Sequence, residues 1–273
     1  MTRANSVLHA GAYREHRPAP PLRAAVECYW TRRASGSPQR VLPDGCIDIL
    51  MWRPLSSTGR ECGDFRAQVV GTMTRAVVTD ASTGEFLGVR FRPGEAYRFL
   101  RFPAVEGTDL DLDLEAIWGA FARDLTDALS RAAGPAARIA VLDRVLLQRH
   151  EGAAPADFRV RRAAAALRLG CDSVADVARD VGLTPRHLQR LFDERVGVGP
   201  RALARILRLQ RCVALLPAGP VTPWAHLALE AGYADQAHLI REFQALAGVS
   251  PTAFVRARAM SDSFNPGGLD LAT

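Results

Sequence analysis

The sequence predicts an α+β chain, in which a mostly-β amino-terminal part with following helices precedes an all-helical carboxyl-terminal part. Three observations support this prediction. Short apolar and β-branched runs separated by turn residues occupy positions 1–103. Apolar residues recur at helical spacing over positions 113–150. The stretch from Ser173 to Arg256 then repeats one pattern twice, which indicates an internal duplication.

The amino-terminal part consists of short predicted strands. Pro43-Asp44-Gly45, Ser56–Gly59 and Arg92-Pro93-Gly94 mark turns between them. Many short strands with such turns predict a small barrel or half-barrel. The expected strands are Ala24–Thr31, Val41–Leu42, Ile47–Trp52, Gln68–Thr72, Ala76–Thr79 and Phe86–Phe91.

Two amphipathic helices are expected next, over Asp113–Ser130 and Ala136–Gln148. Leu114, Ile117 and Phe121 begin the apolar stripe of the first, and the second repeats the spacing. Such helices either form a dimer interface or complete the core of their own domain, and the sequence favours neither.

The duplication shows in matched residues. One copy begins at Val174 and the other at Trp224, and each has a glycine, a second helical segment and a Gly-x-x-Pro ending. The second copy carries one extra residue in its turn. From His187 onward the offset is constant, and the matched pairs include His187 and His238, Arg190 and Arg241, Phe192 and Phe243, Gly197 and Gly248, Pro200 and Pro251.

Each copy has the capping and turn residues of a helix-turn-helix. Ser173 and Thr184 are placed to cap the two helices of the first copy, and Thr222 and Asp235 those of the second. Gly182 lies where the chain turns, because glycine accepts positive φ without steric cost. Two short helices at a steep angle, the second with one exposed face, have the geometry that fits a major groove of DNA.

The predicted exposed face of each second helix carries residues suited to base contacts. Arginine pairs with guanine and glutamine with adenine, each through two hydrogen bonds, and an apolar side chain contacts the thymine methyl group. The other interpretation of such a face is plain solvation; the matched duplication favours nucleic-acid binding. The candidate base-reading residues are Arg186, Gln189 and Arg190 in copy one and Gln236, Ala237, Ile240 and Arg241 in copy two.

Residues from about 159 to 256 resemble the DNA-binding domain of the AraC/XylS family of bacterial transcription regulators. The resemblance implies that the segment Pro200–Leu216 is a long helix joining two helix-turn-helix units, whose recognition helices enter successive major grooves. Trp224 and Ile240 depart from the usual pattern, so base reading by the second unit is less closely matched. The motif residues are Ala175, Gly182, Leu188, Gln189, Arg190 and Phe192, then Ala228, Gly232, Tyr233, Asp235, Gln236, His238, Leu239, Arg241, Phe243 and Gly248–Pro251.

The segments Pro43–Ile49 and Gly88–Gly94 are similar to cupin-like sensory domains attached to many regulators of that family. The resemblance implies double-stranded DNA as a partner, together with a small-molecule effector, RNA polymerase and a second copy of the chain as further candidates. An alternative is a DNA-binding regulator whose amino-terminal domain is a protein-interaction module with no small ligand.

The domain limits agree with the distribution of charge. We expect a sensory or dimerisation domain at 1–151, a small-residue linker at 152–156, the DNA-binding domain at 157–260 and a disordered tail at 261–273. Residues 157–260 carry 15 arginines and 9 acidic residues, a net charge of +6. This equals the net charge of the whole chain, because the charges of the remaining residues cancel. A basic excess in this domain is what phosphate neutralisation requires.

Other classes of protein are disfavoured. No apolar run approaches the ~18 residues that span a bilayer, and positions 1–21 lack the apolar core of a signal peptide, so we expect a cytoplasmic protein. The 5 cysteines are odd in number and widely spaced, which argues against a disulfide framework or a structural zinc site.

We predict no enzyme, no cofactor and no metal site. No nucleophile–base arrangement stands out, and Asp44, Cys46 and Asp48 fit a turn cap followed by a solvent-facing aspartate better than a metal site. A ligand pocket lined by aromatic residues and some arginine is conceivable, although aromatics at strand spacing are commonly core. The residues considered for it are Tyr29, Trp30, Met51, Trp52, Phe65, Phe86 and Phe91.

Overall fold

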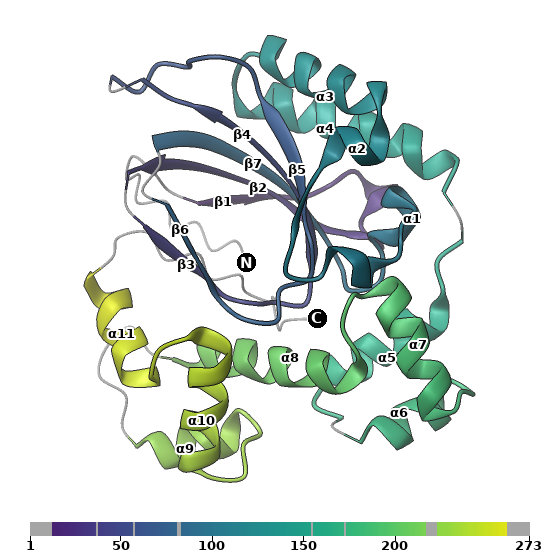
Figure 1. Cartoon of the computed structure of the whole chain (residues 1–273), viewed down its shortest axis with the longest axis vertical. Coiled ribbons are helices and arrows are strands. Elements are labelled where there is room, and N and C mark those ends of the chain that lie inside the picture. Colours follow the sequence, from purple (N-terminus) through teal and green to yellow (C-terminus); the bar gives the residue numbers. More distant parts are fainter. Residues whose placement is uncertain are drawn as a thin grey trace, which may run out of the picture.

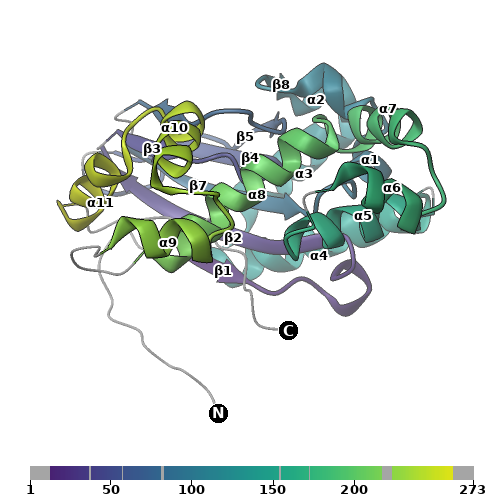
Figure 2. The ribbon, with the colours of Figure 1, turned by 90° about the horizontal axis from the view of Figure 1, so that it is seen from below.

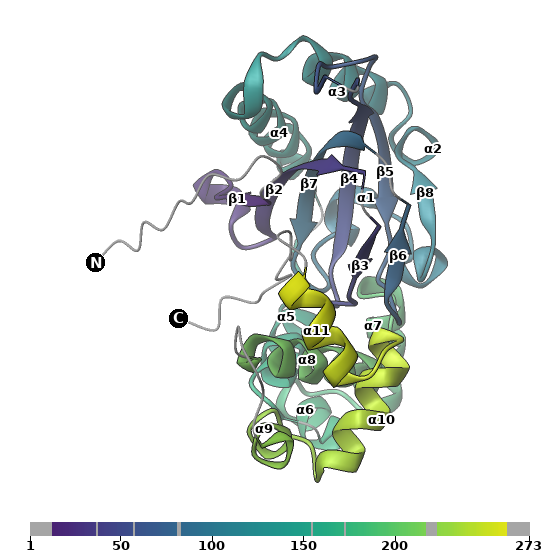
Figure 3. The same ribbon diagram turned by 90° about the vertical axis from the view of Figure 1, so that its left-hand side faces the viewer.

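The computed structural model describes residues 13–36, 38–56, 58–80, 83–153, 155–171, 173–216 and 223–260. A β-rich domain with its own helices lies above an all-helical domain (Figures 1 and 3). The predicted α+β class is confirmed. The tail 261–273, predicted to be disordered, lies outside the described residues.

The β-rich domain has a six-stranded sheet, in the order β1-β2-β7-β4-β5-β8, and a two-stranded ribbon of β3 and β6. All pairs are antiparallel. Every predicted strand forms, and the two edge strands β1 and β8 were not expected. The strands are β1 Arg14–His16, β2 Val26–Ser35, β3 Gln39–Val41, β4 Ile47–Pro54, β5 Arg66–Val70, β6 Val77–Thr79, β7 Thr83–Phe91 and β8 Asp111–Asp113.

Among the described residues, the α-helices of this domain are α1 Tyr97–Leu100, α2 Leu114–Trp118, α3 Ala120–Arg131 and α4 Gly134–Glu151. The prediction of one continuous helix over Asp113–Ser130 is wrong. Gly119 separates α2 from α3 at φ 59° and ψ −136°, a conformation that only glycine adopts readily.

Helices α3 and α4 cover one face of the sheet. Leu125 and Leu129 of α3 and Leu142 of α4 are buried in one core with Ile49 and Met51 of β4. Of the two interpretations of these helices, the structure therefore places them in the core of their own domain. A role in dimerisation stays a prediction.

The residues considered for a pocket divide between the two faces of the sheet. Four of them belong to the buried core of this domain: Tyr29, Met51, Phe65 and Phe91. The other three lie on the opposite face of the sheet and remain partly exposed: Trp30, Trp52 and Phe86.

A buried ion network fastens α4 to the sheet. Glu85 of β7 accepts hydrogen bonds from Arg53 Nε and Nη2 at 2.9 and 2.8 Å and from Arg138 Nη1 at 2.5 Å. Glu61, which is more exposed, also pairs with both arginines. Arg53 and Arg138 are each 3% exposed and Glu85 8%, so the charges neutralise one another away from water.

In its described residues, the helical domain has seven helices, α5 to α11, with a core of its own. Helix α8 runs beneath the sheet with one group of helices at each end (Figure 2). No helix in the described ranges is long and apolar enough to cross a membrane. The helices are α5 Phe158–Arg168, α6 Val174–Asp180, α7 Pro185–Arg195, α8 Pro200–Leu215, α9 Trp224–Glu230, α10 Gln236–Ala247 and α11 Pro251–Met260.

Candidate nucleic-acid interface

The first helix-turn-helix consists of α6 and α7. The Ser173 hydroxyl accepts a hydrogen bond from Asp176 N at 3.2 Å, and the Thr184 hydroxyl accepts one from His187 N at 3.2 Å. Both bonds satisfy backbone donors that the first helical turn leaves unpaired. Gly182 in the turn between the helices has φ +70°, as the glycine there predicts.

Helix α7 buries one face and exposes the other. Leu188 and Phe192 are fully buried, whereas Arg186, Gln189 and Arg190 are exposed. Gln189 Nε2 donates to Asp193 Oδ1 at 2.8 Å along the same helix. Arg186 and Arg190 have no hydrogen-bond or ion-pair partner among the described residues. Their guanidinium groups are therefore free to bind a ligand.

The second unit, α9 and α10, repeats this arrangement. The Asp235 carboxylate accepts from His238 N at 2.6 Å, while Pro223 occupies the N-cap position of α9. Thr222, the predicted cap of α9, lies outside the described residues. Leu239 and Phe243 are fully buried, and the four predicted contact positions on α10 are exposed: Gln236, Ala237, Ile240 and Arg241.

Helix α8 joins the two units as a buried connector. Leu203, Ile206, Leu207 and Leu209 on it are at most 1% exposed. Its apolar positions therefore lie in one continuous core with α7 and α10. The two units therefore pack against one connector through a shared core.

Two arginines of α8 stabilise this arrangement in ways that periodicity did not reveal. Arg205 forms two hydrogen bonds with the Glu242 carboxylate on α10, at 2.7 and 3.0 Å. Arg211 donates to Ala231 O at the end of α9 and to Arg168 O at the end of α5, at 3.2 and 3.5 Å. A cation at the carboxyl end of a helix is favourable, because carbonyl groups there lack partners. The only sequence signal was an excess of arginine.

The β-rich domain caps the carboxyl ends of both second helices. At α7, Thr72 Oγ1 donates to Val196 O at 2.5 Å and Thr108 Oγ1 to Gly197 O at 2.6 Å. At α10, Ala76 N donates to Leu246 O at 2.7 Å and Arg40 Nη1 to Ala247 O at 2.9 Å. Val196 and Ala247 are matched positions of the duplication. The β-rich domain therefore contacts both helix-turn-helix units at equivalent positions, where each second helix ends.

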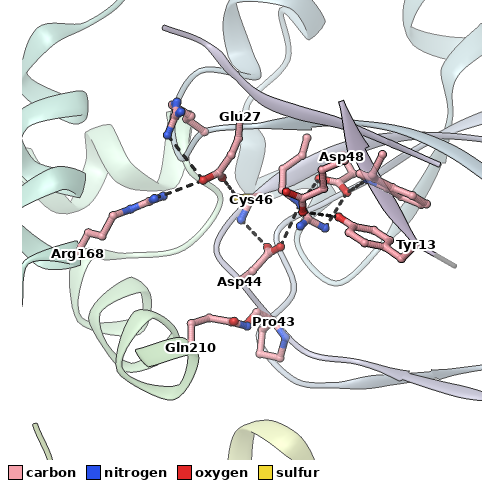
Figure 4. Close-up of polar contacts among 12 residues, drawn as sticks. Tyr13, Glu27, Pro43, Asp44, Cys46, Asp48, Arg168 and Gln210 are labelled. Atoms are coloured by element: carbon pink, nitrogen blue, oxygen red, sulfur yellow. Dashed lines mark hydrogen bonds and ion pairs between the residues drawn. The ribbon is translucent and has the colours of Figure 1, made fainter. Parts of the chain in front are cut away.

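The turn Pro43–Cys46 makes a third contact with the helical domain. Gln210 Nε2 of α8 donates to Pro43 O at 2.6 Å, and Arg168 of α5 reaches Glu27 Oε1 at 3.4 Å (Figure 4). Gly45 has φ +81°, and a β-carbon there would lie 2.4 Å from Leu203 Cδ1. Only glycine therefore fits this turn against α8.

The structure corrects the expectation that Asp48 faces solvent. Its carboxylate pairs with Arg90 Nη2 at 3.2 Å and accepts from Trp30 Nε1 at 2.9 Å. Burial raises the pKa of the Asp48 carboxyl, and Arg90 offsets this only in part. Asp44 caps the turn as expected, through Cys46 N at 2.9 Å. Within the described part of the chain, no three His, Cys, Asp or Glu side chains are grouped to hold a metal ion.

Two protein families match the sequence. Residues 177–257 match the family described as a helix-turn-helix domain, and residues 14–113 match one described as a domain of unknown function, DUF6597. The matched ranges correspond to the two units and to the sheet. No curated protein sequence matches significantly.

Solved structures give weaker likenesses. The carboxyl-terminal domain of AraT, a response regulator from Geobacillus stearothermophilus, is 24% identical over 40% of this chain and 93% of that chain, with a TM-score of 0.35. ToxT from Vibrio cholerae is 11% identical over 84% of this chain and 98% of that chain, with a TM-score of 0.47.

The matched family and the exposed second helices define a DNA-binding domain of the helix-turn-helix class. Residues 177–257 are similar to a helix-turn-helix domain of the AraC type, and this similarity supports a DNA-binding transcription regulator.

Proposed function

We propose that the chain reads a specific DNA sequence with α7 and α10 in successive major grooves, and that an effector bound to the amino-terminal domain regulates it. One observation carries the proposal: two equivalent helices with exposed polar faces are held on one connector. Successive grooves on one side of DNA place the two sets of base contacts about 10 bp apart.

Each candidate residue then has a role that fits its chemistry. Arg186 and Arg190 bind guanine. Gln189 binds adenine once its hydrogen bond to Asp193 is broken. On α10, Gln236 and Arg241 supply polar contacts, while Ala237 and Ile240 contact thymine methyl groups. Helix amino ends attract phosphate through free N–H groups. Ser173, Thr184 and Asp235 cap such ends, and Thr222 is a further predicted phosphate contact.

Regulation would act through the capping contacts. A ligand that shifts the β-rich domain changes the support of α7 and α10 together, because that domain caps both. Differential binding to two domain arrangements is what allows a ligand to change DNA affinity. The proposal includes a cytoplasmic location, a homodimer and contact with RNA polymerase.

One observation favours a second candidate, in which the amino-terminal domain binds a protein and no small ligand. Val77 and Val78 of β6 are 49% and 53% exposed. Neighbouring exposed valines on a two-stranded ribbon suit strand addition by a partner. This candidate predicts DNA binding that depends on a partner protein.

The direct test is fluorescence anisotropy of the full-length protein with its own upstream intergenic DNA and a scrambled duplex, across a salt series. We expect a preference of about 10³ or more for the upstream DNA and a steep salt dependence. Equal binding to both duplexes, with and without candidate effectors, would count against sequence-specific regulation.

Single substitutions on α7 should lower both affinity and specificity. Arg186→Ala or Arg190→Ala should cost about 1–3 kcal/mol of DNA-binding free energy and relax the preference at one base pair. Arg131→Ala, at an exposed arginine of α3, removes the same charge away from the interface and is the control. If both α7 variants bound with unchanged affinity and specificity, α7 would not be the reader.

Removing the caps of α7 should loosen its position. The double variant Thr72→Val/Thr108→Val deletes two hydrogen bonds, each worth about 1 kcal/mol, with little change of shape. We expect it to discriminate less between duplexes that differ by one base pair in the spacing of the two contact sites. Thr126→Val, within α3, is the control. Unchanged discrimination would show that the caps do not position α7.

A further inference from the structure

The six-stranded sheet has a second face that packs into neither hydrophobic core. Strand alternation places Ile49, Met51 and Leu87 beneath α3 and α4 and their sequence neighbours on the opposite side. There, Trp30, Trp52 and Phe86 are aromatic and partly exposed, and they belong to neither core. Large aromatic side chains outside any core commonly mark a binding surface.

One row of this face joins two arginines through two aromatic rings. Arg32 of β2 lies opposite Phe86 of β7, Phe86 opposite Trp52 of β4, and Trp52 opposite Arg66 of β5. Side chains directly opposite on one face are in contact range. Arg66 Cζ lies 5.4 Å from the Trp52 ring centroid, a cation–π contact.

Arg32 has no counterion among the residues that the structure describes. Among the described residues, none forms a hydrogen bond or ion pair with it, and the row contains no acidic residue. Arg53, Arg90 and Arg138, which are buried more deeply, each pair with a carboxylate. Partial burial lowers the pKa of Arg32. A half-buried cation of this kind is suited to an anion.

The adjoining row extends the apolar surface. Trp30 lies opposite Gly88, and Gly88 opposite Leu50. A β-carbon on Gly88 would lie 2.0 Å from the Trp30 indole, so glycine lets that ring lie over the sheet. The face therefore combines a flat apolar floor with an arginine at each end of the first row, while Glu15 lies opposite Trp30 in the adjoining row.

We propose that this face binds a small organic anion, with the anionic group on Arg32 and a flat apolar body on Phe86 and Trp52. Partial burial of these three residues favours a compact ligand over a macromolecule. The inference rests on the proposed function, since it names the chemical class of the effector.

The site is connected to the helical domain. Trp30 Nε1 donates to Asp48, Asp48 pairs with Arg90, and Arg90 pairs with Asp44 at 3.3 Å. Asp44 caps the turn whose Pro43 carbonyl oxygen accepts from Gln210 of α8 (Figure 4). A ligand that displaces Trp30 therefore perturbs a chain of contacts ending on the connector helix.

Isothermal titration calorimetry on the full-length protein tests the site with 4-phenylbenzoate and the neutral 4-phenylbenzamide. The wild type should bind the acid at least about 10-fold more tightly than the amide, because only the acid pairs with Arg32. Arg32→Gln should abolish this preference. Arg33→Gln is the matched control, since its side chain is exposed and lies in the opposite register. Melting temperatures establish that both variants fold.

Absence of binding, equal binding of acid and amide, or equal effects of the two variants would overturn the site. DNA binding, measured separately on the same samples by anisotropy, distinguishes this failure from failure of the proposed function. If the acid binds through Arg32 but DNA affinity does not change, the site stands and its role as an effector site falls. If neither duplex is preferred while the acid binds, the regulator proposal fails alone.

Discussion

Phe192→Ala should lower the free energy of unfolding by about 3–5 kcal/mol, among the largest effects of any single substitution in the helical domain. The ring is fully buried between the first helix-turn-helix unit and α8. Truncation removes its apolar surface and leaves a cavity that the surrounding helices cannot fill, because α8 is fixed by contacts at both ends. Urea unfolding followed by circular dichroism measures the loss.

Two further substitutions make this prediction specific. Phe243→Ala removes the matched ring of the second copy, which is also fully buried, and should cost a similar amount. Phe158→Ala removes a ring that is 69% exposed and should change stability by less than about 0.5 kcal/mol. Equal losses for Phe192→Ala and Phe158→Ala would contradict the burial argument.

Glu85→Ala should destabilise the β-rich domain by about 3–5 kcal/mol. It removes the carboxylate that neutralises Arg53 and Arg138, both 3% exposed, and leaves only the more exposed Glu61 to serve two cations. A buried charge without its partner bears the cost of desolvation with no compensating attraction. Urea unfolding monitored by tryptophan fluorescence reports mainly on this domain, which holds Trp30, Trp52 and Trp118 of the 4 tryptophans.

The matched control is Glu115→Ala, which breaks an exposed ion pair with Arg123. Exposed pairs contribute about 0–1 kcal/mol, so this variant should remain close to the wild type. Similar losses for the two variants would mean that burial does not set the strength of the Glu85 network.

Local signals explain why much of the fold was predictable. The caps at Ser173, Thr184 and Asp235 and the turn at Gly182 each depend on residues a few positions apart. Strands in the first hundred residues likewise follow from short β-branched runs between turns. The duplication adds strength, because two copies of one pattern constrain each other.

Contacts between distant segments explain what the sequence did not reveal. The break at Gly119 depends on a backbone conformation that an uninterrupted apolar stripe conceals. Asp48 looked solvent-facing because its partners Arg90 and Trp30 lie on neighbouring strands. Thr72 and Thr108 carry no motif, and their partners lie more than 80 residues along the chain.

The caps on the two second helices have a consequence for how the protein can change over generations. The copies share their sequence pattern, yet Thr72 and Thr108 serve one helix and Arg40 serves the other. If α7 and α10 each read one half of a DNA target, as proposed, a mutation in either support would affect chiefly the half read by the helix that it caps. Under the proposed function, the two halves of the recognised sequence can diverge separately, although a single fused chain reads both.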